Sequence, residues 1–235
     1  LSWIVLTTFA ALPFAFSQLN LSFTDAFFEA MSGITTTGST IIISLDTAPP
    51  GLLLWRSLLQ WLGGIGIIVM ALAVMPLLRV GGMQLFRMES SDLSEKALPR
   101  AAQVAAAITA IYVILTIIWA ALLWLAGMSG FDAVSHAMTT IATGGFSNYD
   151  ASVGHFDSVA IDIIVTVGMV IGSLPFLLYL MVLQGKPSNL FHDSQVQLFL
   201  TLLGTIILLV AGWLWLENGE EPWQALRLAA FNVVS

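Results

Sequence analysis

The sequence has 235 residues, of which 58% are hydrophobic and 9% are charged, with a mean hydropathy of +0.93 and a net charge of −7. This composition excludes a soluble globular domain, and the lack of a basic stripe argues against nucleic acid as a partner. No cysteine is present, so disulfides and thiolate metal sites are excluded as well. The apolar runs are continuous rather than alternating, which predicts an all-α membrane protein and not a barrel.

A series of apolar elements follows along the chain. We expect spanning helices, the first of them only the tail of one, at 1–16, 51–78, 101–127, 159–183 and 196–216. Shorter runs of about twelve residues cannot cross a bilayer, and we expect re-entrant helices at 22–34, 130–141 and 222–234. Residue 1 is not Met, no signal peptide is evident, and the chain opens in mid-helix, so we expect a piece of a longer protein.

Charged residues divide the connecting loops into two groups. The loops 79–100 and 184–195 contain the basic residues between spans, namely Arg79, Arg87, Lys96, Arg100 and Lys186. The loops 17–50 and 128–158 contain no Lys or Arg and carry Asp25, Glu29, Asp46, Asp132, Asp150 and Asp157 instead. By the positive-inside rule the first group is cytoplasmic and the second faces outside.

The sequence contains an internal repeat. "DAFFEAMSGITTTGST" (25–40) aligns without gaps on "DAVSHAMTTIATGGFS" (132–147), and each copy lies between two spanning helices. A weaker third copy begins at "LAAFNVVS" (228–235), which overlays 25–32. The repeated unit is therefore a spanning helix, a re-entrant helix, a loop and a second spanning helix. We expect the sequence to end inside a third unit.

The loop of each unit is rich in threonine and glycine. Non-helical backbone at membrane depth is tolerated only where it is buried in protein or lines a water-filled cavity. Its carbonyl oxygens can replace the hydration shell of a cation, threonine adds a hydroxyl oxygen, and glycine can adopt φ > 0. The alternative is a plain connecting loop, but two copies at one position of a repeat favour an ion site. The two Thr/Gly loops therefore predict a cation site built from backbone and hydroxyl oxygens.

Four stretches carry a resemblance to a known family: "FFEAMSGITTTGST", "WRSLLQWLGGIGIIVMALAVMPLL", "HAMTTIATGGFSNYDAS" and "LAAFNVVS". With these, the chain resembles the Trk/Ktr/HKT superfamily of potassium transporters. The resemblance implies four helix–pore-loop–helix units around one pore, with one filter glycine per unit, here Gly38 and Gly145. It also implies K⁺ as the favoured ion, and the filter residues that it implies are Thr36, Thr37, Gly38, Thr143, Gly144 and Gly145. Ala142 and Gly144 stand where the first copy has threonines, which predicts a less symmetric and less selective filter.

The resemblance also implies the organisation and the partners. We expect a first pore unit at 1–78, a cytoplasmic connection at 79–100, a second pore unit at 101–183 and the start of a third at 184–235. The implied function is K⁺ uptake across the bacterial inner membrane by a homodimer surrounded by lipid. A cytosolic nucleotide-binding regulatory subunit of the TrkA or KtrA type would hold any nucleotide, and an amphipathic surface helix within 79–100 would offer it a docking face. The alternatives are a Na⁺-influenced or Na⁺-permeable relative and, from another class, a membrane enzyme or scaffold.

Several other residues within the spans allow two interpretations. Gly63, Gly64 and Gly66 indicate close helix packing, rather than a hinge, against the neighbouring re-entrant helix. Arg56 is expected to snorkel or to pair with an acidic residue rather than to contact the ion. Asp162 is expected at the membrane interface rather than at an intramembrane ion site.

The remaining candidates are a set of hydrolase-like residues, two histidines and helix breakers. Ser135 and His136 lie near Asp132 but point about 100° apart on a helix, so we expect no catalytic triad and no enzyme. His155 and His192 are expected in solvated loops. Kinks are expected near Pro76 and Pro175 and their glycine neighbours, Gly168 and Gly172.

Overall fold

The computed structural model describes residues 2–78 and 97–235, and this part of the chain contains helices and loops but no β-strand. The predicted all-α class is confirmed. The helices are α1 (Ser2–Ala15), α2 (Phe23–Ile34), α3 (Pro50–Leu78), α4 (Ala97–Leu125), α5 (Gly130–Ile141), α6 (Val159–Ser173), α7 (Phe176–Leu183), α8 (Ser188–His192), α9 (Ser194–Asn218) and α10 (Pro222–Val234). Short 3-10 turns lie at Leu45–Thr47 and Ser152–Phe156.

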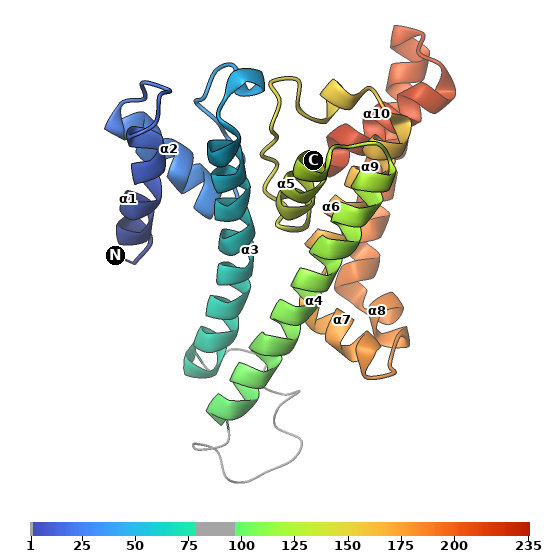
Figure 1. Cartoon of the computed structure of the whole chain (residues 1–235). Coiled ribbons are helices and arrows are strands. Elements are labelled where there is room, and N and C mark those ends of the chain that lie inside the picture. The colour runs from blue at the N-terminus through green and yellow to red at the C-terminus, as the bar shows by residue number, and fades with distance from the viewer. Residues whose placement is uncertain (1, 79–96) are drawn as a thin grey trace.

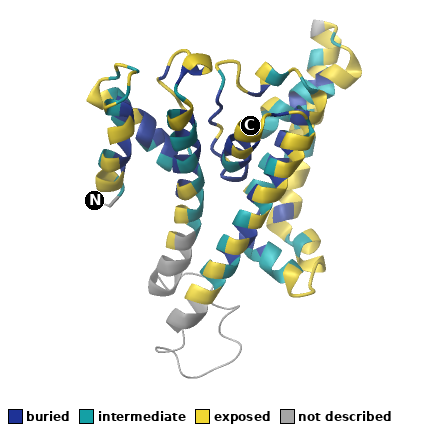
Figure 2. Cartoon of the chain, viewed as in Figure 1, coloured by how far each residue is buried: buried dark blue, intermediate teal, exposed yellow. Residues whose placement is uncertain are grey.

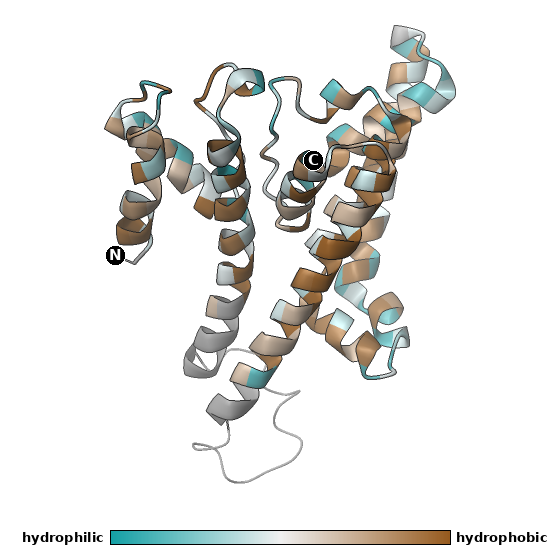
Figure 3. Ribbon diagram, viewed as in Figure 1, coloured by the Kyte–Doolittle hydropathy of each residue, from teal (hydrophilic) through white to brown (hydrophobic). Residues whose placement is uncertain are grey.

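The long helices run along the length of the molecule, whereas the short re-entrant helices do not (Figure 1). Among the described residues, α3, α4 and α9 are each long and apolar enough to cross a membrane. The helices α2, α5 and α10 lie within one residue of the expected re-entrant helices and occupy only one half of the fold. Apolar residues run along α4, whereas polar residues gather in the connecting loops (Figure 3).

The segment expected to span at 159–183 is bent in its middle, and the kink expected near Pro175 is confirmed. The helix breaks between α6 and α7, which meet at a bend of 90°. Leu174 has an extended ψ of 149° because Pro175 disfavours the helical conformation of the residue before it and donates no hydrogen bond. The kink belongs to Pro175 and not to the glycines: a Cβ at Gly168 would clash with Trp119, and one at Gly172 would lie 2.8 Å from the carbonyl oxygen of Ile141.

Two predictions concern residues that lie partly outside the described ones: the kink near Pro76 and the cytoplasmic connection at 79–100. The side chains around Pro76 are not described, although α3 is helical there. Most of the segment expected as a cytoplasmic connection and docking face, residues 79–96, lies outside the described residues. Its last residues, 97–100, form the first turn of α4.

The two complete re-entrant helices begin in the same way. The Ser22 hydroxyl accepts a hydrogen bond from the Asp25 backbone N–H at the start of α2, and the Ser129 hydroxyl accepts one from Asp132 at the start of α5. Each serine thereby pairs one of the N–H groups that a helix leaves free at its N-terminus, which contributes about 1 kcal/mol. The serine and the aspartate at equivalent positions of the repeat therefore set the first residue of both helices.

The helix α3 joins the two repeat units. One hydrophobic core lies between α1, α2 and α3 and includes Phe14, Ala30 and Leu59. A second lies around α4, α5 and α6 and includes Leu123 and Ala137. Because α3 contacts α2, α4 and α5, its side chains reach both units. The helix α5 carries buried residues along most of its length (Figure 2).

The expected glycine packing on α3 is confirmed at two of three positions. A Cβ at Gly63 would clash with the carbonyl oxygen of Ile34 at the end of α2, and one at Gly64 would lie 2.8 Å from the Tyr112 hydroxyl. Gly66 is exposed and has nothing within 4 Å of its Cβ position. Gly63 therefore lets α3 approach the re-entrant helix of its own unit, as small residues do in membrane proteins.

Gly63→Ala should destabilise the full protein by roughly 1–3 kcal/mol, since the added methyl group must push α2 away from α3. Gly66→Ala is the matched control, and it should be neutral or stabilising by up to about 1 kcal/mol because alanine favours the helix. The thermal melting temperature of the purified full protein in detergent measures both. Equal melting temperatures for the two variants would show that Gly63 is not a packing position.

Candidate functional site

The first Thr/Gly segment (33–44) begins with a tight turn at the end of α2. The Thr37 N–H donates to the Ser32 carbonyl at 2.9 Å, and the Thr36 N–H donates to the Gly33 carbonyl at 3.0 Å. This is the hydrogen-bond pattern of a Schellman motif, which requires a left-handed residue after the helix. Thr36 is that residue, with φ of +54°. A β-branched side chain in this region is strained, and the surrounding structure must hold it there.

The second Thr/Gly segment (140–147) repeats the turn at the end of α5. The Gly144 N–H donates to the Thr139 carbonyl at 2.9 Å, and the Thr143 N–H donates to the Thr140 carbonyl at 3.0 Å. Thr143 is left-handed as well, with φ of +51°. Two strained threonines at equivalent positions of a repeat indicate a functional conformation, since strain of this kind is concentrated at functional sites.

The glycines that follow the two turns also share one conformation. Gly38 and Gly145 both have φ of +80°, so each segment changes direction at its glycine. The two segments then meet, because a Cβ at Gly38 would clash with the carbonyl oxygen of Gly144. The negative ends of the α2 and α5 dipoles lie at this meeting point, where they favour a cation.

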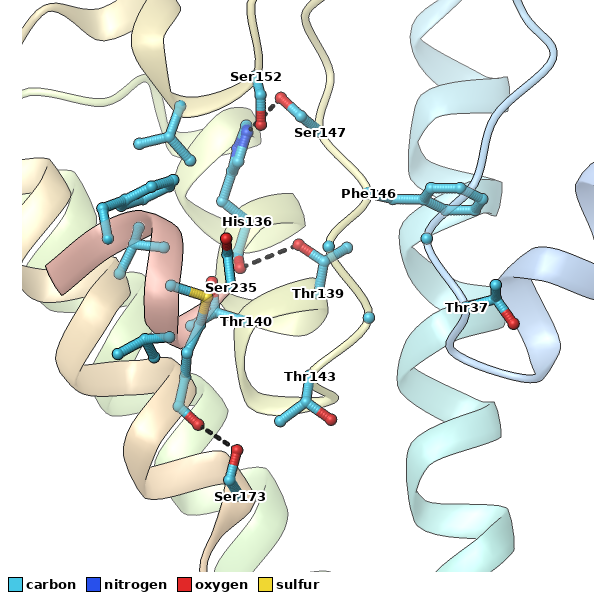
Figure 4. A pocket seen from close by; sticks show the side chains of 18 residues that line it. Thr37, His136, Thr139, Thr140, Thr143, Phe146, Ser147, Ser152, Ser173 and Ser235 are labelled. Atoms are coloured by element: carbon cyan, nitrogen blue, oxygen red, sulfur yellow. Dashed lines mark hydrogen bonds between the residues drawn. The ribbon is translucent and has the colours of Figure 1, made fainter. Parts of the chain in front are cut away.

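A cavity of about 360 Å³ lies beside the two segments. Thr37 reaches it from the first segment, and Thr143, Phe146 and Ser147 reach it from the second (Figure 4). Five of the six predicted site residues line it: Thr37, Gly38, Thr143, Gly144 and Gly145. The sixth, Thr36, forms the turn of the first segment instead.

Gln60 is a site residue that the sequence interpretation missed. It lies on α3, is fully buried, and donates from Nε2 to the Gly144 carbonyl at 2.7 Å. Its Oε1 accepts from the Phe146 N–H at 3.0 Å. A helix of the first unit thus holds the backbone of the second Thr/Gly segment. The signal was a polar side chain in the middle of an apolar run, which is costly in a membrane and indicates a buried partner.

Arg56 lies one turn earlier on α3, and the expectation that it pairs with an acidic residue is confirmed. Its Nε lies 2.7 Å from Glu29 Oε1, and the two side chains are only 1% and 0% exposed. Its Nη1 donates to the Ser147 carbonyl at 2.7 Å, and its guanidinium lies 4.1 Å from the centre of the Phe146 ring.

Glu29 and His136 occupy equivalent positions of the repeat and make equivalent contacts. Glu29 accepts from the Thr40 hydroxyl at 3.0 Å, whereas His136 Nε2 lies 3.0 Å from the Ser147 hydroxyl. Each of these bridges joins a re-entrant helix to a hydroxyl eleven residues further along the chain. Because His136 Nδ1 lies 2.8 Å from the Asp132 carbonyl oxygen, it donates there and leaves Nε2 to accept.

These contacts do not form a catalytic triad. The Asp132 carboxylate accepts from Ser129, Asn148 and Tyr149 at 2.6–3.1 Å, and the sole His136 contact to Asp132 that the described residues show is to its backbone. Burial raises the pKa of Asp132, but the hydrogen bonds from Ser129, Asn148 and Tyr149 outweigh it and hold the pKa below its ordinary value. The ionised carboxylate anchors the loop after the second segment.

The other acidic and histidine candidates lie away from the cavity. Asp162 pairs with Arg227 of α10 at 3.7 Å, with both side chains 23% exposed. His155 and His192 are exposed, as expected, but His155 lies in a 3-10 turn, where it stacks on Tyr149, and His192 is the last residue of α8 rather than part of a loop. Within residues 2–78 and 97–235, no group of three or more His, Cys, Asp or Glu side chains is placed to hold a metal.

The fold and the site define an all-helical membrane protein built from repeated units of spanning helix, re-entrant helix, Thr/Gly segment and spanning helix. The TrkH family of cation transport proteins matches residues 1–218, and the chain belongs to this family. It is 46% identical to the Trk system potassium uptake protein TrkI of Halomonas elongata and 42% identical to TrkH of Escherichia coli K12, in each case over 100% of this chain.

The same similarity extends to a solved structure. The crystal structure of the potassium transporter TrkH from Vibrio parahaemolyticus superposes with a TM-score of 0.89 at 39% identity, covering 99% of this chain. The chain spans about half the length of these relatives: 48% of TrkI, 50% of the Escherichia coli protein and 48% of the crystallised one.

Proposed function

We propose that the full protein takes up K⁺ through a pore whose selectivity filter includes the two Thr/Gly segments. One observation carries this proposal: two equivalent segments meet at Gly38 and Gly144, with matching left-handed threonines and glycines, beside one cavity. Such backbone offers oxygens without charge, which suits a weakly hydrated cation that must both enter and leave. The names of the relatives, which are potassium uptake proteins, support the same ion.

The contacts of Gly144 refine the predicted ligand set. Its carbonyl oxygen accepts from Gln60, so that oxygen is held toward α3. In our proposal Gly144 is a structural residue, and the ligands of the second segment are oxygens of Thr143 and Gly145. The ligands of the first segment are oxygens of Thr36, Thr37 and Gly38. The third and fourth segments of the filter belong to sequence that this chain does not include.

The position of the basic loop supports the proposed orientation. The connection between α7 and α8, which contains Lys186, lies at the end of the molecule opposite the outer loops of both units (Figure 1). By the positive-inside rule, that end faces the cytoplasm and the Thr/Gly segments open to the outside of the inner membrane. A homodimer in lipid and a cytosolic nucleotide-binding regulatory subunit of the TrkA or KtrA type complete the proposal.

One observation favours a second candidate, a Na⁺-influenced or Na⁺-permeable transporter. The second segment lacks two of the hydroxyls of the first, since Ala142 and Gly144 replace threonines. Fewer oxygen ligands on one side of the filter reduce discrimination between cations.

Uptake of ⁸⁶Rb⁺ by the full protein, expressed in a strain without its own K⁺ uptake systems, tests the proposal. We expect uptake above the empty-vector level and competition by K⁺ at a concentration at least about tenfold lower than by Na⁺. Equal competition by the two ions would favour the Na⁺-permeable alternative. Uptake no greater than with the empty vector would contradict both.

A further inference from the structure

Arg56 connects the two Thr/Gly segments to each other. Its Nε bonds Glu29, which belongs to the first unit, and its Nη1 bonds the Ser147 carbonyl of the second unit, both at 2.7 Å. The guanidinium lies against the Phe146 ring, so its orientation is fixed by a third contact. One rigid side chain thus touches groups from both units.

Glu29 carries the connection on to the first segment. Its Oε2 accepts from the Ile41 backbone N–H at 2.9 Å, and its two oxygens accept from the Thr40 hydroxyl at 3.0 Å. A continuous chain of hydrogen bonds therefore runs from the backbone of Ile41 through Glu29 and Arg56 to the backbone of Ser147. Its central part, from Glu29 through Arg56 to Ser147, is almost fully buried, so water does not weaken it there, whereas Thr40 and Ile41 at its other end are exposed.

The second unit has His136 at the position equivalent to Glu29, and the hydrogen bonds that His136 makes within the described residues do not cross between the units. His136 there makes the same bridge to a hydroxyl, but it is a neutral donor and acceptor and reaches its own unit only in the contacts described. The acidic residue of the first unit is needed for a different purpose, which is to hold a guanidinium that crosses between units.

We propose that Arg56, held by Glu29, is a positioning residue that sets the spacing of the two Thr/Gly segments and so determines the preference for K⁺ over Na⁺. This inference rests on the proposed function. Loops without a regular hydrogen-bond ladder cannot hold their oxygens at fixed distances by themselves. They need hydrogen bonds from side chains of the surrounding helices. The planar guanidinium, with nitrogens at fixed separation, is suited to span two acceptors, whereas a lysine ammonium is a single point charge.

Stability alone does not explain the pair. A buried ion pair is seldom more stabilising than apolar residues of the same volume, because both charges lose their water. Its position at the junction of two units agrees with a role in fixing geometry.

Arg56→Lys in the full protein is the direct test. Lysine keeps the charge beside Glu29 but cannot also reach Ser147, so the segments lose their link. We expect the K⁺ over Na⁺ preference in ⁸⁶Rb⁺ competition to fall about tenfold, with the amount of protein in the membrane unchanged. Arg227→Gln is the matched control, because it breaks the Asp162–Arg227 ion pair, which touches neither segment, and it should leave the preference unchanged.

The double variant Glu29→Gln with Arg56→Gln removes both charges together and leaves no unpaired buried charge to unfold the protein. It also loses the link to Ser147, and we expect the same tenfold loss of preference, about the size of one coupled contact. An unchanged preference in Arg56→Lys or in the double variant overturns the inference, as does an equal loss in Arg227→Gln. Absence of K⁺ uptake by the parent protein would instead overturn the proposed function.

Discussion

Gly38→Ala should lower K⁺ uptake by the full protein by about 100-fold or more, because displacement of positioned groups by an ångström has effects of that size. Two causes act together. The residue has φ of +80°, which costs an L-amino acid roughly 1–2 kcal/mol. Its Cβ would also clash with the carbonyl oxygen of Gly144, so the two Thr/Gly segments must separate.

Gly145→Ala is the matched control, because it imposes the strain of a positive φ without a clash. Gly145 has the same φ of +80°, but its Cβ position has nothing within 4 Å. We therefore expect a loss of about tenfold, which corresponds to a strain of 1–2 kcal/mol. Initial rates of ⁸⁶Rb⁺ uptake, divided by the amount of protein in the membrane, compare the two variants. A greater loss in Gly145→Ala than in Gly38→Ala would contradict the proposed contact between the segments.

Much of the fold could be predicted from the sequence because it depends on local properties. The length of an apolar run decides whether a helix can cross a bilayer, and the runs at 22–34, 130–141 and 222–234 are too short to do so. The re-entrant helices α2, α5 and α10 were therefore found within a residue of their observed bounds. The bend at Pro175 was a local signal as well, and the kink predicted there is the one that separates α6 from α7.

The contacts behind the Thr/Gly segments could not be predicted in the same way. Gln60 and Gly144 are 84 residues apart, and Arg56 and Ser147 are 91 apart. A single sequence indicates that a buried polar residue needs a partner, but not which partner it has. The choice depends on how α3 packs between the two units, which is a tertiary property. The left-handed threonines were missed for a related reason, because residue preference favours glycine at that position and the Schellman turn overrides it.

Gln60→Leu should destabilise the full protein by roughly 2–5 kcal/mol, because two buried backbone groups lose their partners at a cost of about 1–3 kcal/mol each. Those groups are the Gly144 carbonyl and the Phe146 N–H, and both belong to the second Thr/Gly segment. Leucine has nearly the size of glutamine, so the loss reports the hydrogen bonds rather than a cavity. Leu62→Ala, at a position of α3 that is 51% exposed, is the control and should change stability by less than about 0.5 kcal/mol.

Gln60→Glu separates the two hydrogen bonds of the glutamine. A carboxylate can still accept from the Phe146 N–H, but it cannot donate to Gly144 and would repel that carbonyl oxygen. The freed carbonyl should turn away from Gln60, toward the cavity or the first segment. We therefore expect Gln60→Glu to reduce the preference for K⁺ over Na⁺ by about tenfold, as the loss of one charge-strengthened contact would. Melting temperature and ⁸⁶Rb⁺ competition together distinguish the two roles of the residue. If Gln60→Glu melts like the parent and also keeps its ion preference, the contact with Gly144 does not hold the second segment in place.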